Sequence, residues 1–400
     1  MRRTATVSIV LSLILLVGSA EGRTWCIKLD GTGDAPTIQA GIDSAAAGDM
    51  VLVFKGTYNE NITFRGRNIL LSSLEGSSVT TISSAAPGTP VLGAYSHETT
   101  ALTIRGFSIT GASGSGAAPD GVRCIRGSAT VQDCIVHGNS DEGLYARECS
   151  LKVVRCVVYN NGFGAGADYG TGIAGQQAGY VIVDSCTVYY NNEANIILQE
   201  TSHASVTHTI VCGSPKRGFQ LLTLSSLSCS CNDVWSNGSC PDSNYVGIGD
   251  QTGLNSNICL DPLFCFAEGA DYTLHANSPC LDAPGCGQIG ALGPGCPSNG
   301  VEELVGSLPT PMLDQNAPNP FNPITTIRYG LPEEGQVKLT LYDVTGEPII
   351  VLVDRRESAG YHTVVWSGEN ADGLSVASGI YIYRLEAGDF VATRKMVLLR

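Results

Sequence analysis

A short pattern recurs between residues 120 and 237 with nearly constant spacing. Each repeat has a four-residue first half that starts with Gly or Asn. The second half reads Val-x-x-Cys-x-Val-x-x-Asn in three repeats and Val-x-x-Thr-x-Val-x-x-Ser in a degenerate fourth. A period this regular indicates a solenoid. Apolar residues alternate with polar ones inside each repeat, so we predict short strands that stack as a parallel β-helix. The first halves start at Gly121, Gly143, Gly172, Asn195 and Gly218, which are 22, 29, 23 and 23 residues apart.

Stacking places equivalent residues in columns about 4.8 Å apart. One inward column is predicted to hold small packing residues, with metal binding and disulfides as the alternatives for its cysteines. A second column, of asparagines, is predicted to sit at a turn, because Asn tolerates left-handed backbone and can hydrogen-bond along the stack. The first column comprises Phe107, Cys134, Cys156, Cys186 and Thr209, and the second comprises Asn139, Asn161 and Asn191.

The amino terminus has the pattern of an export signal. Arg2 and Arg3 precede an apolar run, and Gly18-Ser19-Ala20 offers a cleavage site. The net charge of −14 argues against nucleic acid and anionic membrane surfaces as partners. No further stretch of the sequence is long and apolar enough to span a bilayer. We therefore expect an exported protein.

Fifteen cysteines in an exported chain can pair in an oxidising compartment. Eight of them crowd the last repeats and the irregular segment that follows, and we expect these to form disulfides at the open end of the solenoid. Their spacing is not that of a zinc ribbon, and no histidine follows at a ligand interval, so no metal is expected. The eight candidates are Cys229, Cys231, Cys240, Cys259, Cys265, Cys280, Cys286 and Cys296.

A different pattern precedes the repeats. In residues 37–48, Ile38, Ile42 and Ala45 fall on one helical face, and Gly48 is a natural stop. A short helix here would cap the apolar core, which a solenoid otherwise exposes at its end.

The carboxy-terminal part differs from the repeats. Residues 297–315 are rich in Pro, Ser and Gly and are expected to be a linker, and residues 316–400 carry longer alternating stretches that predict a small antiparallel sandwich. The expected all-β organisation is therefore a signal peptide (1–20), a β-helix (21–296), the linker (297–315) and an antiparallel sandwich (316–400). The predicted sandwich strands are Thr325–Tyr329, Gln336–Asp343, Ile349–Asp354, Tyr361–Trp366, Gly379–Glu386 and Phe390–Leu399.

Several stretches in the amino-terminal half resemble pectin-lyase-like right-handed β-helix proteins. They include the opening Asp30-Gly31-Thr32-Gly33-Asp34 and the turn Gly56-Thr57-Tyr58-x-Glu60-Asn61-Ile62. The resemblance covers residues 26–296 and implies a right-handed parallel β-helix. The further motifs of pectin methylesterases and polygalacturonases are missing from this sequence, so the resemblance implies the fold without either activity.

The stretches Gln315–Pro323 and Ala377–Leu385 resemble the carboxy-terminal sorting domains of type IX secretion and the related immunoglobulin-like domain of flagellar hook-capping proteins. In sorting domains this module is an address that the outer-membrane export machinery reads. The resemblance implies that residues 316–400 bind this machinery and that the chain passes through the periplasm to the cell surface. A passive sandwich that pairs with another protein is the alternative.

The repeats also bring charged residues together. Asp120 and Glu142 precede neighbouring repeats and would lie about 5 Å apart, where two carboxylates can share a cation such as calcium or raise each other's proton affinity. Arg123 is predicted to face outward on the same sheet, and Asp168 lies in the extra residues of the longest repeat, which form a loop at that edge. These four residues are the catalytic candidates, with solvated turn acids as the alternative. No cofactor is otherwise expected.

Aromatic residues supply the binding candidates. His137, Tyr159 and Tyr189 each lie three residues after a column cysteine, and they would form either an outward ladder on which sugar rings can stack or a packed edge. Tyr145, predicted to face outward with Ala174, Ile197 and Gln220, and Tyr169 in the extra loop complete the set.

Together these patterns predict an exported, cell-surface β-helix protein that binds, or is displayed toward, an extracellular polysaccharide. A polysaccharide lyase or glycoside hydrolase is one alternative, although the sequence holds no complete catalytic set. A non-catalytic surface spacer is the other alternative.

Overall fold

The structure is a computed structural model of the 400-residue chain. The predicted signal peptide, most of the predicted linker, Asp168, Tyr169 and Cys240 lie outside the residues that it describes. Among the described residues, no helix is long and apolar enough to cross a membrane. The described residues are 22–114, 119–164, 170–238, 241–296, 311–316, 319, 321, 325–358, 360–371 and 373–398.

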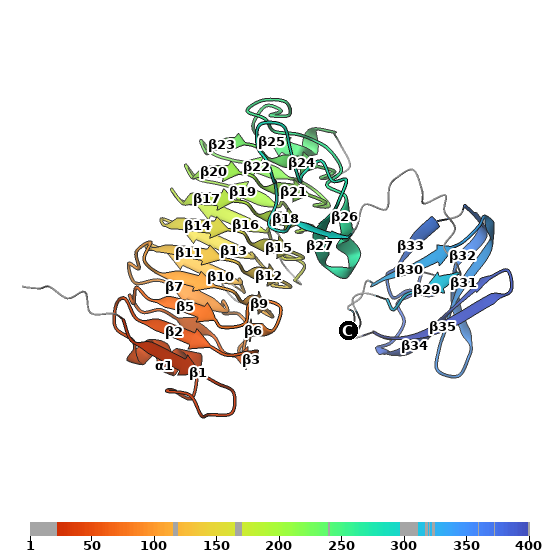
Figure 1. Cartoon of the computed structure of the whole chain (residues 1–400), viewed down its shortest axis with the longest axis horizontal. Helices are drawn as coiled ribbons and strands as arrows, with labels where there is room; N and C mark the ends of the chain where they lie inside the picture. The colour runs from red at the N-terminus through yellow and green to blue at the C-terminus, as the bar shows by residue number, and fades with distance from the viewer. Residues whose placement is uncertain are drawn as a thin grey trace, which may run out of the picture.

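The larger part of the chain is a parallel β-helix in which successive coils supply strands to three parallel sheets (Figure 1). Sheet 1 contains β1 (Thr24–Ile27), β2 (Met50–Val53), β5 (Leu70–Ser73), β8 (Thr103–Arg105), β11 (Ser128–Gln132), β14 (Ser150–Val154), β17 (Tyr180–Asp184), β20 (His203–Thr207) and β23 (Ser226–Ser230). Sheet 2 contains β3 (Gly56–Asn59), β6 (Thr80–Ser83), β9 (Ser108–Thr110), β12 (Ile135–His137), β15 (Val157–Tyr159), β18 (Thr187–Tyr189), β21 (Ile210–Cys212) and β24 (Asp233–Trp235). Sheet 3 contains β4 (Ile62–Thr63), β7 (Leu92–Ala94), β10 (Val122–Ile125), β13 (Leu144–Arg147), β16 (Ile173–Gln176), β19 (Ile196–Leu198), β22 (Phe219–Leu221) and β25 (Tyr245–Val246).

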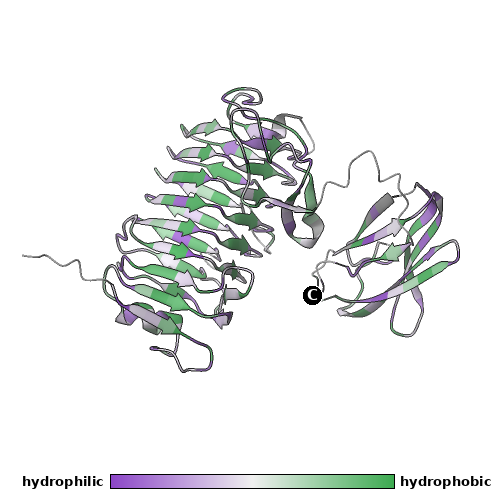
Figure 2. Cartoon of the chain, in the orientation of Figure 1, coloured by the Kyte–Doolittle hydropathy of each residue, from purple (hydrophilic) through white to green (hydrophobic). Residues whose placement is uncertain are grey.

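The register of sheet 3 confirms the repeat alignment made from the sequence. Val122 pairs with Leu144, and the series continues coil by coil to Phe219. The paired residues are buried because alternate side chains of every strand point into the solenoid. Figure 2 shows the same alternation, with hydrophobic colour concentrated on the strands of the solenoid.

The predicted inward column is confirmed, and it also carries hydrogen bonds. Each backbone N–H donates to the polar side-chain atom of the next coil: Cys134 N–H to the Cys156 sulfur (3.5 Å) and Cys156 N–H to the Cys186 sulfur (3.4 Å). The hydroxyl of Thr209 accepts the N–H of Cys186 in the same way. Thr209 therefore keeps the bonding pattern of the column although it replaces a cysteine.

The asparagine column forms a ladder of amide hydrogen bonds. The side chain of Asn139 donates to that of Asn161 (3.0 Å), and Asn161 donates to Asn191 (3.0 Å). This confirms the predicted bonding, but the predicted left-handed backbone is wrong for these residues. The residue before each of the last two, Asn160 and Tyr190, takes the positive φ instead.

The amino-terminal cap is helix α1 (Ile38–Ser44). Ile38, Ile42 and Ala45 are buried against the first coil as predicted, although the helix ends before Gly48. The side chain of Thr37 accepts the N–H of Ala40, a standard amino-terminal cap. Glu60 from the next turn accepts the N–H groups of Ile38 and Gln39, both at 2.9 Å, so its carboxylate stabilises the amino terminus of the helix.

A closing segment, residues 258–296, folds back over the last coils of sheet 2. Ala283, Ile289 and Leu274 pack there on Ile210 and Cys212 of β21. Backbone bonds tie the same surfaces, since Gly290 N–H donates to the carbonyl of His208. The segment and the turn before it contain η1 (Pro241–Asn244), β26 (Phe264–Phe266), η2 (Ala267–Gly269), β27 (Asp271–His275) and β28 (Pro294–Cys296).

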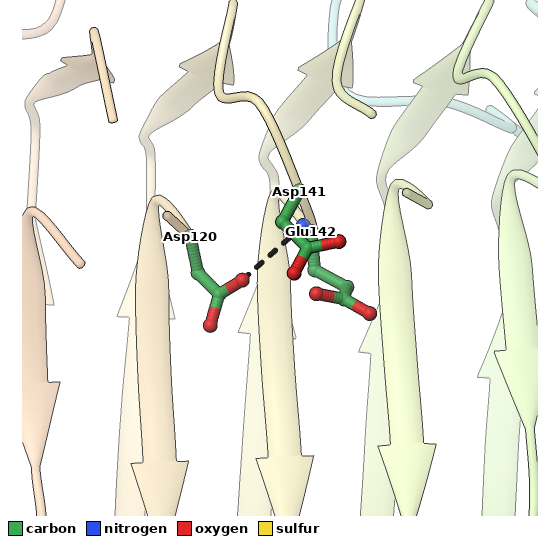
Figure 3. Close-up of side chains that lie close together, drawn as sticks. All are labelled: Asp120, Asp141 and Glu142. Atoms are coloured by element: carbon green, nitrogen blue, oxygen red, sulfur yellow. Dashed lines mark hydrogen bonds between the residues drawn. The ribbon is translucent and has the colours of Figure 1, made fainter. Parts of the chain in front are cut away.

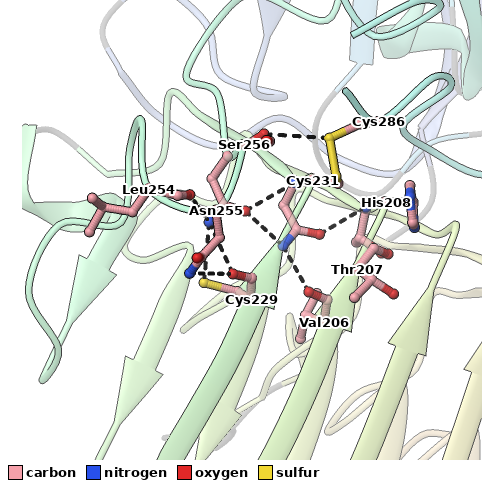
Figure 4. Close-up of a disulfide and its surroundings, with 12 residues drawn as sticks. Val206, Thr207, His208, Cys229, Cys231, Leu254, Asn255, Ser256 and Cys286 are labelled. Carbon is pink, nitrogen blue, oxygen red and sulfur yellow. Dashed lines mark hydrogen bonds between the residues drawn. A yellow bond between two sulfur atoms is a disulfide. The ribbon is translucent and has the colours of Figure 1, made fainter. Parts of the chain in front are cut away.

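Two disulfides hold this region, Cys231–Cys286 and Cys265–Cys296. The first ties the end of β23 to the closing segment, where Cys231 N–H also donates to the carbonyl of Asn255 (Figure 4). The disulfide prediction is confirmed for these four cysteines.

The disulfide prediction is wrong for Cys229, Cys259 and Cys280, which are free thiols. Cys229 occupies an inward position of β23 and packs in the solenoid core. The thiol of Cys280 donates to Asp233 (3.1 Å), a contact that the spacing of cysteines in the sequence does not reveal.

The carboxy-terminal part is an antiparallel sandwich with its own core, which includes Tyr329, Trp366 and Tyr383. All six predicted strands are present. The sequence missed β29, which lies inside the predicted linker yet pairs with β30 and buries Leu313. One sheet contains β29 (Met312–Leu313), β30 (Thr325–Leu331) and β33 (Gly360–Trp366), and the other β32 (Pro348–Glu357), β31 (Gly335–Tyr342), β34 (Gly379–Ala387) and β35 (Phe390–Leu398).

Candidate functional site

The candidate site lies on the row of turns that lead from sheet 2 to sheet 3, which we call the loop edge. The loop edge carries the inserted loop of the longest repeat. The predicted acids lie toward the amino-terminal end of the loop edge. The described residues of the loop edge are 110–114, 119–121, 138–143, 160–164, 170–172, 190–195 and 213–218.

Three carboxylates meet at the loop edge: Asp120, Asp141 and Glu142 (Figure 3). One oxygen of each lies within 4.8 Å of the others. Asp120 and Glu142 immediately precede the first glycines of adjacent coils, so the in-register backbone stacks them, and Glu142 N–H donates to Asp120 (3.2 Å). The predicted proximity of these two acids is therefore confirmed. Asp141 was missed, because only the turn geometry brings its side chain back toward its neighbours.

These acids are not solvated turn residues. Asp120 is fully buried, and Glu142 is 9% exposed. Burial, reinforced by the neighbouring charges of Asp120 and Asp141, raises the pKa of Glu142 well above its ordinary value. Burial also raises the pKa of Asp120, although the guanidinium of Arg123 opposes that shift. Burial and neighbouring charge thus favour the neutral form of Glu142, whereas Asp120 pairs with the guanidinium of Arg123.

The three carboxyl groups are better suited to hold a proton and to pair with an arginine than to bind a metal ion. Oxygen ligands from three acids are what calcium prefers. However, both oxygens of Asp120 already accept hydrogen bonds, from Glu142 N–H and from Arg123 at 2.6 Å. The guanidinium supplies a positive charge that a divalent cation would have to displace. We therefore assign no metal to these residues.

Arg123 lies between aromatic rings on the outer face of sheet 3. Its guanidinium stacks over Tyr145, 4.1 Å from the ring centroid. Tyr95, which the sequence analysis missed, lies on the same face. Its ring covers Gly93, where a Cβ would come within 2.3 Å of a ring carbon. Glycine is therefore required for Tyr95 to lie flat on the sheet.

Tyr145 faces outward from the solenoid core, as predicted, but it is buried. It belongs to a small separate cluster with Ala174, Ala194 and Ile197, and its hydroxyl donates to Gln176. The predicted outward direction of these side chains is therefore right. However, Tyr145 is buried, so its ring is not accessible to a ligand. Tyr145 acts instead as the surface on which Arg123 rests.

The predicted ladder of His137, Tyr159 and Tyr189 is a packed edge. His137 and Tyr159 stack in parallel with centroids 5.0 Å apart. Tyr272 of the closing segment packs against both Tyr159 and Tyr189, at 5.0 and 5.1 Å, and Phe264 meets Tyr189 edge-on. Of the two predicted alternatives, the packed edge is therefore the one that the structure shows, because the closing segment covers the rings. Burial lowers the pKa of His137 to about 4.

A different aromatic pair is exposed on the loop edge. Phe163 and Tyr190 stack with centroids 5.4 Å apart and ring planes 19° apart, and they are 45% and 38% exposed. They come from neighbouring coils, and Phe163 begins the inserted loop. Gly164 N–H donates to the carbonyl of Ser140, which precedes Asp141, so the loop joins the aromatic pair to the acid cluster.

Ion pairs occupy the far end of the loop edge. Glu193, with its side chain 13% exposed, pairs with both Lys216 and Arg217 of the next coil. The side chain of Arg217 also lies 3.5 Å from that of Gln220 on β22. The loop edge therefore presents acids, an aromatic pair and an ion-pair cluster of one carboxylate with two cations in sequence along the solenoid axis.

Comparisons with known proteins agree with this architecture. Residues 92–256 match the family model of the right-handed β-helix region, and residues 324–389 match that of the FlgD Ig-like domain. No curated protein sequence matches the chain. The β-helix is therefore right-handed, and the sandwich is immunoglobulin-like.

Solved structures with similar folds include polysaccharide lyases. Pectate lyase Pel9A is 14% identical over 64% of this chain and 90% of its own, with a TM-score of 0.45. An alginate lyase from Paenibacillus sp. str. FPU-7 is 16% identical over 54% of this chain and 77% of its own, with a TM-score of 0.37. PorZ, a surface component of the type-IX secretion system of Porphyromonas gingivalis, is 22% identical over 26% of this chain, with a TM-score of 0.17, and the chain spans only 13% of that protein. Identities and scores this low carry no information on activity.

Proposed function

We propose that this chain is an exported, cell-surface β-helix protein that binds an extracellular polysaccharide at the loop edge. The observation that carries the proposal is the exposed, stacked pair of Phe163 and Tyr190 beside the inserted loop. Flat aromatic faces are the usual support for the apolar C–H faces of sugar rings, and insertions on one side of a solenoid commonly form its binding side.

Delivery to the surface is the second part of the proposal. The immunoglobulin-like sandwich would act as the sorting address, and its resemblance to type IX sorting domains supports this role. Deletion of Gly379–Arg400 removes two of the four strands of one sheet. We expect the deleted protein to stay in the periplasm, as measured by surface proteolysis and cell fractionation. Unchanged surface delivery would reject the sorting role while leaving the binding role intact.

A polysaccharide lyase or hydrolase is the second candidate, favoured by the closeness of Asp120 and Glu142 and by the raised pKa of Glu142. Paired carboxylates with separated proton affinities are the usual equipment of glycosidic-bond cleavage. The burial of Asp120 favours binding over catalysis, since a fully buried carboxylate cannot reach a substrate without movement of its surroundings.

Retention on immobilised glycans distinguishes these functions. The full-length protein without its signal peptide is passed over neutral and uronic-acid polysaccharides, and both retention and released sugars are measured. We expect retention without release. The double variant Phe163→Ala/Tyr190→Ala should lose at least about tenfold in affinity, because two stacking surfaces are removed.

Tyr180→Ala is the matched control, because Tyr180 is equally exposed (45%) but lies on sheet 1. Its retention should equal that of the unaltered protein. Sugar release that Glu142→Gln abolishes would establish the enzyme instead. If no polysaccharide is retained or cleaved, both candidates are rejected and the solenoid is a spacer.

A further inference from the structure

We infer that Cys124 and Cys149 form a third disulfide, which ties two neighbouring coils in the middle of the solenoid. The inference rests on the exported setting of the proposed function, because disulfides form and persist in oxidising compartments. Both residues are thiols in the structure, beside the two disulfides already described. The positions of their side chains favour a covalent link between them.

The backbone register brings the two cysteines to one coil boundary. Cys124 lies on β10 and pairs with Ala146 of β13. Cys149 directly precedes β14, after Glu148 has turned the chain with a positive φ. Both cysteines belong to the solenoid core and are 0% and 6% exposed. Cys149 therefore lies at the corner between sheets 3 and 1, one coil beyond Cys124.

The two thiols interact directly inside this corner. A hydrogen bond between Cys149 and Cys124 is the largest cause of the raised pKa of Cys149, and burial raises that pKa further. Each thiol thus has the other within reach, away from solvent.

The repeat supplies a second measure of this separation. Gly175 and Ser202 stand at the same two positions two coils further on, although the turn before Ser202 is one residue longer. A Cβ on Gly175 would lie 3.4 Å from the Cβ of Ser202. The two Cβ atoms of a disulfide are about 3.5–4.5 Å apart. Side chains at these two positions therefore approach closely enough to be linked.

The coils on either side have no thiol at these positions. The positions next to Cys124 in its column hold alanine, and those next to Cys149 hold glycine. Cysteine therefore occupies both contacting positions of this coil boundary and neither position of the adjoining coils. The neighbours in the two columns are Ala94 and Ala146 for Cys124, and Gly127 and Gly179 for Cys149.

The cysteines of the inward column are placed differently. Cys134 and Cys156 stand at the same place before β12 and β15, which pair in register on strands about 4.8 Å apart. That spacing exceeds the Cβ separation of a disulfide, about 3.5–4.5 Å. The sulfur of Cys156 also accepts the N–H of Cys134. We therefore expect the inward column to keep its free thiols.

The cross-link forms by exchange with a disulfide carrier, either a low-molecular-weight disulfide or an oxidoreductase. The thiolate of Cys149 attacks one sulfur of the carrier and releases one carrier thiol. The thiolate of Cys124 then attacks the Cys149 sulfur and displaces the second carrier thiol. The two protein thiols are oxidised, the carrier disulfide is reduced to two thiols, and the protons pass to the released thiols. Because the raised pKa keeps Cys149 protonated in the folded solenoid, we expect exchange during folding.

Peptide mapping of the full-length protein without its signal peptide tests the inference. The reduced, unfolded protein is refolded in a mixture of oxidised and reduced glutathione, alkylated in denaturant, digested with trypsin and analysed by mass spectrometry without reduction. Trypsin releases Cys124 in residues 124–126 and Cys149 in residues 148–152. We expect these two peptides as one linked species that a reductant separates. Cys134 and Cys156 should be recovered alkylated.

Two variants follow the chain's own repeats. Cys149→Ser copies Ser202, and Cys124→Ala copies Ala146, so both should fold. Each should lose the linked species and should unfold about 5 °C below the oxidised unaltered protein. The difference should disappear when the proteins are compared in reductant. Cys26→Ser on β1 is the control and should keep both the link and the thermal midpoint.

The two disulfides of the closing segment make the outcomes distinguishable, because they report whether the protein met an oxidising compartment. Protein collected from the cell surface is mapped in the same way. If those two disulfides are formed while Cys124 and Cys149 are recovered alkylated, or linked to other cysteines, in either sample, the inference is overturned and export stands. If all three disulfides form in glutathione and none is present in the cell-derived protein, the exported setting of the proposed function fails and the pairing stands.

Discussion

Single residues of the inward column combine packing with hydrogen bonding. Cys134, Cys156 and Cys186 each accept a backbone N–H from the preceding coil, and Thr209 and Asn232 do the same at later positions. The feature that these five residues share is a polar atom near Cβ, not sulfur. The column thus satisfies N–H groups that a purely apolar column would leave unpaired inside the core.

Substitution of Cys156 separates the two contributions. Cys156→Val keeps the volume but leaves the N–H of Cys134 without an acceptor, so the free energy of unfolding should fall by about 2 kcal/mol. Cys156→Thr restores an acceptor, as Thr209 does, and should lose less than half as much. Urea denaturation measures both. Equal losses in the two variants would show that the column acts by packing alone.

Asp233 should make the closing segment sensitive to pH. Burial raises the pKa of Asp233 to about 7, although the N–H of Leu260 (3.0 Å) and the thiol of Cys280 lower it in part. The folded protein then keeps a proton that the unfolded chain releases near pH 4. Stability is therefore fully present below about pH 4 and falls as the pH rises through 7, by on the order of 3 kcal/mol.

The variant Asp233→Asn tests this dependence. Asparagine cannot ionise, so its stability curve between pH 4 and 8 should be flatter than that of the unaltered protein when both are measured by urea denaturation. Parallel curves for the two proteins would contradict the assignment. Titrations common to both, such as that of His137, cancel in the comparison.

Residue positions were predictable where the period alone decides them. Asp120 and Glu142 stand at the same place in successive repeats, so their proximity follows from the register. Tyr95 and Asp141 were not predictable in this way, because the first depends on a ring lying over Gly93 and the second on the path of one turn. The exposure of Tyr145 was misjudged because a small cluster outside the core covers it.

At the scale of elements, the asparagine ladder has a substitution that preserves it. In the fourth repeat Ser214 occupies the ladder position. Asn195, which directly precedes β19 in the same repeat, takes over its bonds, accepting from Asn191 (2.9 Å) and donating to Asn237 (2.9 Å). The other repeats have glycine where Asn195 stands. At Gly172, for example, a Cβ would lie 2.7 Å from the side-chain nitrogen of Asn191. The short side chain of Ser214 leaves room for Asn195.

A double-mutant cycle tests this exchange. Asn195→Gly alone breaks the ladder and Ser214→Asn alone crowds Asn195, so each should cost about 1–3 kcal/mol of unfolding free energy. The double variant restores the arrangement of the other repeats and should recover about 1–2 kcal/mol relative to the sum. Additive losses in thermal or urea denaturation would show that the two positions are independent.

Strands and their register were predictable because they repeat, and the cap helix because its apolar spacing is helical. The closing segment was not, since the contacts of Tyr272 with Tyr159 and Tyr189 join residues more than 80 positions apart and follow no period. For this reason the sequence left open whether His137, Tyr159 and Tyr189 form an outward ladder or a packed edge. The ring column of His137, Tyr159 and Tyr189 has the spacing of an outward ladder, and only the unpredicted return of Tyr272 covers it.

At the scale of the whole molecule, the solenoid and the sandwich have separate apolar cores, made of different residues. A chain that ends at Cys296 keeps every solenoid strand and both disulfides. We expect its thermal midpoint to lie within about 5 °C of the solenoid transition in the full-length protein, because few stabilising contacts are removed. Calorimetry measures both transitions. Failure of the shortened chain to fold would show that the sandwich supports the solenoid.

The ladders that run along the solenoid have a mechanical consequence. Their hydrogen bonds point along the axis, so a force that pulls the two ends apart acts on every coil boundary, and the columns of one boundary share that load and fail together. Such a molecule should yield under tension in steps of one coil. Because Cys231–Cys286 locks the far end, extension would start at the α1 cap. A protein displayed at a cell surface would thereby lose coils before it lost its closed end.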